Sequence, residues 1–130
     1  MHEWSIADNL VKLVVSAAEK ERLESVSRVV IQVGVLQQVI PESLEMAFSF
    51  LGRETPVAGA VLEIETIPLK ARCRDCGAQT SGNDFIFTCS ACGGFDLDIL
   101  AGKELYIDYI EGEAKNNRDK SEDKCLKKKI

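Results

Sequence analysis

The sequence lacks both an excess of basic residues and a long hydrophobic run. Its 130 residues include 16 lysines and arginines against 21 aspartates and glutamates, which gives a formal net charge of −5. This balance argues against a nucleic-acid clamp and against a polybasic membrane-surface module. No apolar run approaches the ~20 residues that span a bilayer, and the N-terminus lacks a signal-peptide pattern. We therefore expect a cytoplasmic protein without a membrane or nucleic-acid partner.

Histidine is almost absent, since His2 is the only one in the chain. With no second histidine, no phosphate-binding loop and no open metal site, the sequence gives no support to an enzyme. Disulfides are rare in the cytosol, so the five cysteines are better explained as metal ligands than as disulfide partners.

The chain does contain alternating helical and strand patterns. Apolar residues recur every three or four positions over 5–20, which predicts an amphipathic helix. Residues 26–37 are rich in β-branched side chains and predict a strand. Pro41 begins a second helix, because its missing N–H costs nothing at a first helical position. Apolar and polar residues alternate over 61–67 and 103–110, which predicts two further strands.

The first of these strands is expected to have one buried face and one partly solvated face, because successive side chains point to opposite sides. The buried face would contain four β-branched residues: Val29, Ile31, Val33 and Val35. The partly solvated face would contain Arg28, Gln32 and Gly34.

The order of the elements predicts an α+β fold with an insertion, because the cysteine-rich segment lies between two strands of the same character. We expect two helices and a small mixed or antiparallel three-stranded sheet. Together they would form a core from residues 1–69 and 101–112. A zinc-ribbon-like domain with four cysteine ligands, over 70–100, interrupts this core. Residues 113–130 are highly charged and almost free of apolar side chains, so we expect a disordered tail. Cys125 in this tail has no partner at ligand spacing.

The cysteine-rich segment contains two C-x-x-C-G knuckles, Cys73/Cys76 and Cys89/Cys92, separated by twelve residues. Two cysteines at this spacing in a tight turn can aim both sulfurs at one point, and the following glycine permits a positive φ. Four thiolates then form a closed tetrahedral shell, the geometry of a structural Zn(II) site. Disulfides and rubredoxin-type iron are the alternatives. We favour one structural zinc per chain, because most of the chain lies outside the insertion.

The N-terminus is a second candidate metal site. Initiator methionine is retained before a large residue such as His2, so the terminal amine of Met1, backbone nitrogens and the imidazole lie within one chelate. Such a nitrogen set favours Ni(II) or Cu(II) over zinc, and Glu3 adds a backbone nitrogen and a carboxylate. The alternatives are that a lone histidine is incidental and that Glu3 only complements the helix dipole.

The whole pattern resembles the HypA/HybF family, the nickel metallochaperones of NiFe-hydrogenase maturation. The matching segments, in order, are Met1-His2-Glu3 before a helix, IQVGVLQQV followed by PESLEMAF, GAVLEIETIP, the two C-x-x-C-G pairs, and GKELYIDYIE. The resemblance covers roughly residues 1–112. It departs from the family at Ser90, where proline is common, and in the charged tail.

The resemblance implies a nickel-binding domain with an inserted zinc domain. It implies that His2 is the essential nickel ligand, helped by the backbone nitrogens of His2 and Glu3, and that the four paired cysteines bind zinc. It also implies two partners, a HypB-type GTPase and a hydrogenase large-subunit precursor, and some family members serve urease. We therefore rank metal delivery first, a zinc-ribbon interaction or nucleic-acid-binding module second, and an enzyme last. The oligomeric state, monomer or homodimer, is open.

Overall fold

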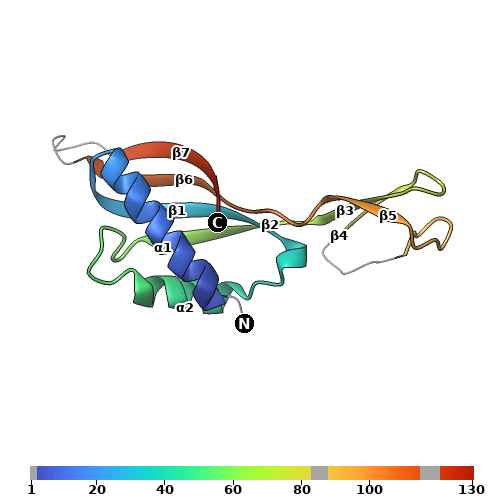
Figure 1. The fold of residues 1–130 in the computed structure, drawn as a ribbon, viewed down its shortest axis with the longest axis horizontal. Coiled ribbons are helices and arrows are strands. Elements are labelled where there is room, and N and C mark those ends of the chain that lie inside the picture. Colours follow the sequence, from blue (N-terminus) through green and yellow to red (C-terminus); the bar gives the residue numbers. More distant parts are fainter. Residues whose placement is uncertain (1–2, 83–87, 115–120) are drawn as a thin grey trace. The chain divides into compact units, whose positions relative to one another are not determined.

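A computed structural model describes residues 3–82, 88–114 and 121–130. Its two α-helices are α1 (Glu3–Lys20) and α2 (Pro41–Leu51), and a short 3-10 helix, η1 (Val35–Gln37), lies between them in sequence. The strands are β1 (Leu23–Gly34), β2 (Val61–Ile67), β3 (Leu69–Cys73), β4 (Gln79–Gly82), β5 (Leu97–Ala101), β6 (Leu105–Ala114) and β7 (Ser121–Lys129). Figure 1 shows their arrangement along the chain.

The strands form two separate sheets. The first has the order β2-β1-β6-β7, and the second has the order β4-β3-β5. In the second sheet β3 pairs antiparallel with both of its neighbours, so that Ala71 lies opposite Thr80 on one side and Ile99 on the other. Two helices, a sheet that contains the three predicted strands, and a separate cysteine-rich sheet confirm the predicted α+β class.

The chain divides into two compact units. The helical unit comprises Met1–Ile31, Val39–Glu65 and Tyr106–Ile130, and the cysteine unit comprises Gln32–Gln38 and Thr66–Leu105.

The core of the helical unit is formed by the apolar faces of its helices and sheet. On α1 the buried stripe includes Ile6, Leu10 and Val14, and α1 packs against α2. On α2 the buried residues are Leu44, Ala47 and Phe48, which keep the predicted helical spacing. Strand β6 adds Ile107 and Ile110, both fully buried. The amphipathic patterns of both predicted helices are thus confirmed.

Strand β1 differs from the prediction at its end and on one face. It ends at Gly34, so Val35, which was predicted to lie on the buried face of the strand, is only half-buried and begins η1 instead. Arg28 is partly exposed as expected, and it forms ion pairs with Glu63 of β2 (3.0 Å) and Glu111 of β6 (3.1 Å) that tie three neighbouring strands together. Gln32 and Gly34, predicted to be partly solvated, are instead buried. For Gly34 the reason is a close backbone contact that strand periodicity cannot reveal. A Cβ on Gly34 would lie 2.1 Å from the carbonyl carbon and oxygen of Gly102.

The C-terminal segment also differs from the prediction. Disorder is predicted for 113–130, whereas the structure continues β6 to Ala114 and forms β7 over Ser121–Lys129. Strand β7 pairs antiparallel with β6. Composition could not predict this strand, because backbone pairing to an open sheet edge requires no apolar side chains.

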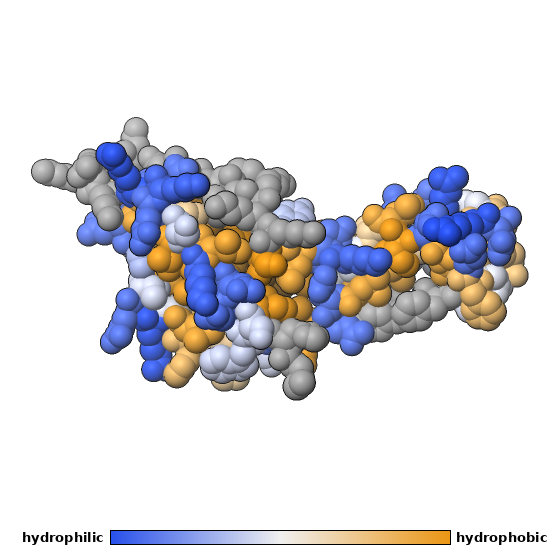
Figure 2. Space-filling model, viewed as in Figure 1, coloured by the Kyte–Doolittle hydropathy of each residue, from blue (hydrophilic) through white to orange (hydrophobic). Residues whose placement is uncertain are grey.

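Both units expose large apolar side chains among their described residues. In the helical unit they are Trp4, Ile40, Met46, Phe50 and Val61, and in the cysteine unit they are Phe95 and Leu100. Figure 2 shows hydrophobic and hydrophilic residues interspersed over the visible face of the molecule.

Candidate metal centre

Two knuckles with the same backbone pattern hold the cysteines. In the first, the N–H of Gly77 donates to the carbonyl of Cys73 at 2.9 Å, and in the second the N–H of Gly93 donates to the carbonyl of Cys89 at 2.9 Å. Gly77 and Gly93 have φ values of 77° and 73°. The glycine after each C-x-x-C pair therefore adopts the positive φ that the sequence predicts.

Strand pairing places the first knuckle. Cys73 is the last residue of β3 and lies opposite Leu97 of β5. Its N–H donates to the carbonyl of Ala78 at 2.9 Å, and in the second knuckle the N–H of Cys89 donates to the carbonyl of Gly94 at 2.8 Å. Both knuckles are therefore closed by their own backbone hydrogen bonds.

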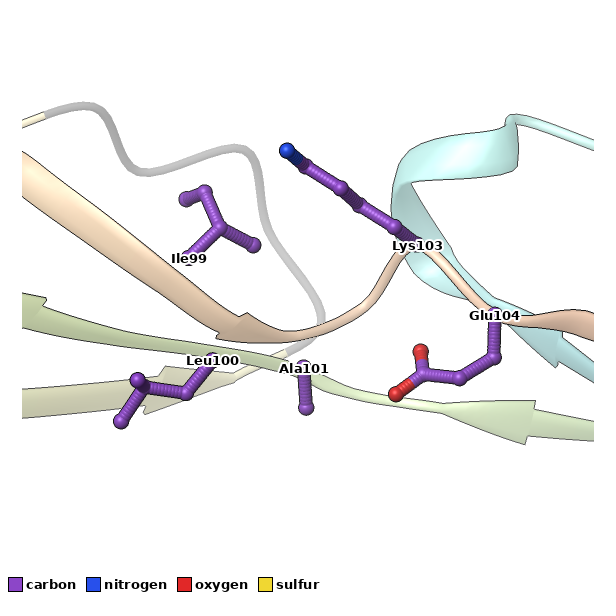
Figure 3. A pocket seen from close by; sticks show the side chains of 5 residues that line it. All are labelled: Ile99, Leu100, Ala101, Lys103 and Glu104. Carbon is purple, nitrogen blue, oxygen red and sulfur yellow. The ribbon is translucent and has the colours of Figure 1, made fainter.

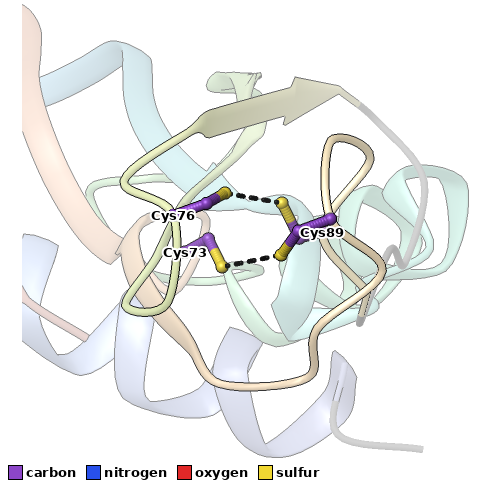
Figure 4. A group of neighbouring side chains, drawn as sticks. Cys73, Cys76 and Cys89 are labelled. Atoms are coloured by element: carbon purple, nitrogen blue, oxygen red, sulfur yellow. Dashed lines mark hydrogen bonds between the residues drawn. The ribbon is translucent and has the colours of Figure 1, made fainter.

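The four sulfurs gather around one point, as Figure 4 shows. The ligand atoms of Cys73, Cys76, Cys89 and Cys92 all lie within 4.8 Å of one another. The sulfurs of Cys73 and Cys92 are 3.6 Å apart, and those of Cys76 and Cys89 are 3.5 Å apart. A tetrahedral Zn(II) with Zn–S bonds of about 2.3 Å requires sulfurs about 3.8 Å apart. The cluster therefore fits a tetrahedral metal site.

The protonation of the cluster is uneven. Backbone N–H groups of Cys92 and Ala91 hydrogen-bond to the Cys89 sulfur and lower the pKa of its thiol to about 6. A backbone hydrogen bond from Gly94 also lowers the pKa of Cys92, but the other three sulfurs outweigh it and raise this pKa to about 12. One thiol in the cluster therefore loses its proton more easily than another, because neighbouring thiolates repel each other. A central cation would stabilise all four thiolates at once.

Two contacts around the cluster were not predicted from the sequence. Arg74 donates from Nε to Asp98 of β5 at 2.8 Å and pairs with Asp96, which ties the first knuckle to β5. This hydrogen bond, together with the positive charge of Arg74, lowers the pKa of Asp98. A Cβ on Gly94 would lie 2.9 Å from a carboxylate oxygen of Asp75 and 3.3 Å from the Cys92 sulfur. In the sequence, the second glycine of Gly93-Gly94 could have indicated that the backbone there lies too close to its neighbours for a side chain.

Of the candidate nickel ligands, Met1 and His2 lie outside the described residues. Glu3 is the first residue of α1 and is only 6% exposed. Its neighbour Trp4 is half exposed, and its ring meets that of Phe50 edge-on at 5.6 Å. The structure therefore places Glu3 at the start of a packed helix, directly after Met1 and His2 in the sequence.

A pocket in the cysteine unit is separate from the four cysteines. It has a volume of about 210 Å³ and is lined by Ile99, Leu100, Ala101, Lys103 and Glu104, as Figure 3 shows. Glu104 accepts a hydrogen bond from the N–H of Gly102 at 2.7 Å, so its carboxylate is engaged by the backbone. The four sulfurs, and not this pocket, have the donor set of a metal site.

The fold and the sulfur cluster together define a small two-unit α+β protein in which four cysteine sulfurs are arranged as a tetrahedral metal ion would require. The family described as "Hydrogenase/urease nickel incorporation, metallochaperone, hypA" matches residues 1–112. The chain belongs to this HypA family, which confirms the resemblance seen in the sequence. None of the described helices is long and apolar enough to cross a membrane.

Individual relatives agree with this assignment. "Hydrogenase maturation factor HypA" of Dehalococcoides mccartyi strain CBDB1 is 38% identical over 111 residues, which are 85% of this chain and 93% of the relative. The protein of the same name from Moorella thermoacetica is 37% identical over 113 residues, 87% of this chain and 100% of the relative. The solution structure of the Ni metallochaperone HypA from Helicobacter pylori matches with a TM-score of 0.63 and 25% identity, over 88% of this chain and 100% of that one.

Proposed function

We propose that this protein binds Ni(II) at its N-terminus and delivers it for the maturation of NiFe-hydrogenase, and of urease where the cell makes one. The observation that supports this proposal is the family match over residues 1–112. The nickel ligands are the imidazole of His2 and the backbone nitrogens of His2 and Glu3, with the terminal amine of Met1 as a further donor. Nitrogen ligands of this kind suit Ni(II) better than Zn(II).

The four cysteines hold one structural Zn(II) per chain, and this ion is not the cargo. The sulfur spacings of 3.5 and 3.6 Å support this part of the proposal, because they suit a closed tetrahedral thiolate shell. Such a shell leaves no position open for a water or substrate, so the ion supplies folding energy to the cysteine unit.

Delivery of nickel requires partner proteins. It does not require this protein to catalyse a reaction. The protein therefore acts in the cytoplasm as a carrier that is not an enzyme. It works with a HypB-type GTPase and transfers nickel to a hydrogenase large-subunit precursor. An N-terminal chelate suits transfer by ligand exchange, because a partner reaches it without unfolding the core.

The test is nickel titration of His2→Ala with a native, unextended N-terminus. We expect specific nickel binding to be lost, because His2 is the only histidine in the chain. Zinc content and helical content should stay unchanged. Nickel bound to the unmodified protein should be released as the pH falls through the histidine pKa of ~6.5, since protons compete for the imidazole.

Two further variants separate the ligands. Glu3→Gln keeps the backbone nitrogen and removes only the carboxylate charge, so we expect a milder loss of nickel affinity. Residues added before Met1 should weaken binding only if the terminal amine is a ligand. If His2→Ala retained one tightly bound Ni(II) per chain, the N-terminal site would be rejected and the cysteines would become the candidate nickel site.

A further inference from the structure

Helix α2 exposes large apolar side chains on the face that does not pack into the core. Its buried residues recur every three or four positions and therefore occupy one face. On the exposed side, Met46 is 65% exposed and Phe50 is 50% exposed. These two residues are one helical turn apart, so they are neighbours on the helix surface. Trp4 at the start of α1, which lies beside α2 in Figure 1, meets the Phe50 ring and extends this α2 patch.

The two ends of the α2 patch have opposite charges. Glu42 and Glu45 are exposed near the start of α2. Arg53 follows the end of the helix, and its guanidinium carbon lies 4.5 Å from the centroid of the Phe50 ring. Glu42 is therefore about three turns, or roughly 16 Å along the axis, from Arg53. Within the part of the chain that the structure describes, none of these three charged groups forms an ion pair.

This arrangement is complementary to itself. In an interface with two-fold symmetry, each contact occurs twice with the roles of the two copies exchanged. If two α2 helices pack antiparallel, Arg53 of each copy lies at the acidic end of the other helix. Met46 of each copy then lies near Phe50 of the other, where a thioether and an aromatic ring attract each other. Parallel packing would instead bring like charges together at both ends, so the charges favour the antiparallel arrangement.

We propose that the α2 patch is a docking surface for a second copy of this chain, with the two α2 helices antiparallel and Arg53 of each copy paired with Glu42 of the other. Docking would remove the exposed apolar side chains of the patch from water, which favours association. Helix α2 has only 11 residues, so the interface is at the small end of the range for specific association. We therefore expect a dimer that dissociates on dilution. The proposal is independent of the proposed function.

The first test is analytical ultracentrifugation of the full zinc-loaded chain over a wide range of concentrations. Reducing conditions prevent dimers that form through disulfides. We expect a monomer–dimer equilibrium that salt weakens, because exposed ion pairs are screened. Met46→Lys should weaken dimerisation about tenfold or more, because the symmetry places two unpaired ammonium groups at the centre of the interface. A chain that stays monomeric at every concentration would overturn the proposal.

The second test exchanges the charges at the two ends of the patch. Arg53→Glu should weaken self-association about tenfold, because it places like charges together at both ends. Glu42→Arg should have a smaller effect, because Glu45 remains. An equimolar mixture of the two variants should form a heterodimer more stable than either homodimer, because every Glu42–Arg53 contact is again between opposite charges. Helical circular dichroism should be unchanged, since both side chains are exposed.

The control pair is Lys20→Glu and Glu19→Arg, which make the same changes of charge at exposed positions of α1 outside the patch. Each control should dimerise like the unmodified protein, alone and in a mixture. Equal strengthening on mixing in the control and test pairs would show attraction by net charge alone. Unchanged dimerisation of Arg53→Glu would show that the copies meet through another surface. Either result would overturn the proposal.

Discussion

The helical unit and the cysteine unit differ in what holds them together. Among the described residues, the buried apolar side chains of the cysteine unit are Val33, Leu69, Ala71 and two of the four clustered cysteines, Cys73 and Cys89. All the others belong to the helical unit, where both helices and the sheet contribute them. One unit has a conventional hydrophobic core, and the other has four sulfurs in the place of a core.

This difference teaches that the two units should respond to different perturbations. Burial of apolar surface stabilises a unit whether or not a metal ion is bound. A thiolate centre stabilises its unit only while a metal is bound and the cysteines are deprotonated. Metal removal should therefore destabilise the cysteine unit, and truncation of buried apolar side chains should destabilise the helical unit.

The largest effect is expected from Cys73→Ala. Loss of one ligand should abolish stable zinc binding and unfold the cysteine unit, because little else holds it, while the helical unit stays folded. Metal analysis, circular dichroism of the helices and hydrogen exchange of both units would measure this. Loss of helical signal together with zinc would contradict the comparison and show that the units fold as one.

The converse variant is Leu10→Ala, which truncates a fully buried side chain of α1. We expect the helical unit to lose about 2 to 5 kcal/mol of unfolding free energy through lost contacts and a cavity. Denaturant unfolding followed by helical circular dichroism gives this value. Met46→Ala on α2, where the side chain is 65% exposed, is the control and should change stability by about 0.5 kcal/mol or less. Loss of zinc from Leu10→Ala would argue against independent units.

A smaller effect is expected from Gly94→Ala, which sharpens the comparison within the cysteine unit. The new Cβ would press on the Asp75 carboxylate and the Cys92 sulfur, so one ligand must move. Outer contacts of a metal site typically change affinity by about tenfold or more, and competition with a chelator would measure this. Gly82→Ala is the control, because a Cβ there meets nothing within 4 Å. Equal zinc affinity in both variants would show that the knuckle adapts.

The smallest effect is expected from Arg74→Gln, which removes an exposed ion pair. The pKa of Asp98 is lowered by its hydrogen bond to Arg74 and by the nearby charge. The pair therefore stabilises the folded state above the unfolded pKa of Asp98, and this contribution disappears as the pH falls through its folded pKa. The variant should be slightly less stable than the unmodified protein near neutral pH. A difference in melting temperature that persisted at acid pH would point to a cause other than the charge pair.

Much of the helical unit could be predicted from the sequence, because its elements are long and strongly patterned. The predicted strand at 61–67 coincides with β2, and the helix predicted to start at Pro41 does start there. The short strands β3, β4 and β5 were not predicted, because four or five residues cannot establish a period. Burial of Gly34 was also missed, since it depends on a backbone contact with a residue distant in sequence.

The cysteine cluster itself was easier to predict from the sequence than the residues around it. Cysteine spacing alone identified the four residues whose sulfurs the structure brings together. The nickel ligands remain a prediction for Met1, His2 and Glu3. Neighbours such as Arg74 and Asp75 could not be predicted, because no local pattern distinguishes a charged residue beside a knuckle from any other exposed charge.

The closure of each knuckle within its own short segment has a consequence for protein engineering. Hydrogen bonds within 73–78 and within 89–94 shape the two halves of the centre separately. The chain that connects them need only allow the halves to meet, and doubling the length of such a connection costs about 0.6 kcal/mol. A reporter peptide inserted between Gly82 and Thr88 should therefore leave the sulfur geometry intact, and it would turn zinc occupancy into a signal that can be followed in a living cell.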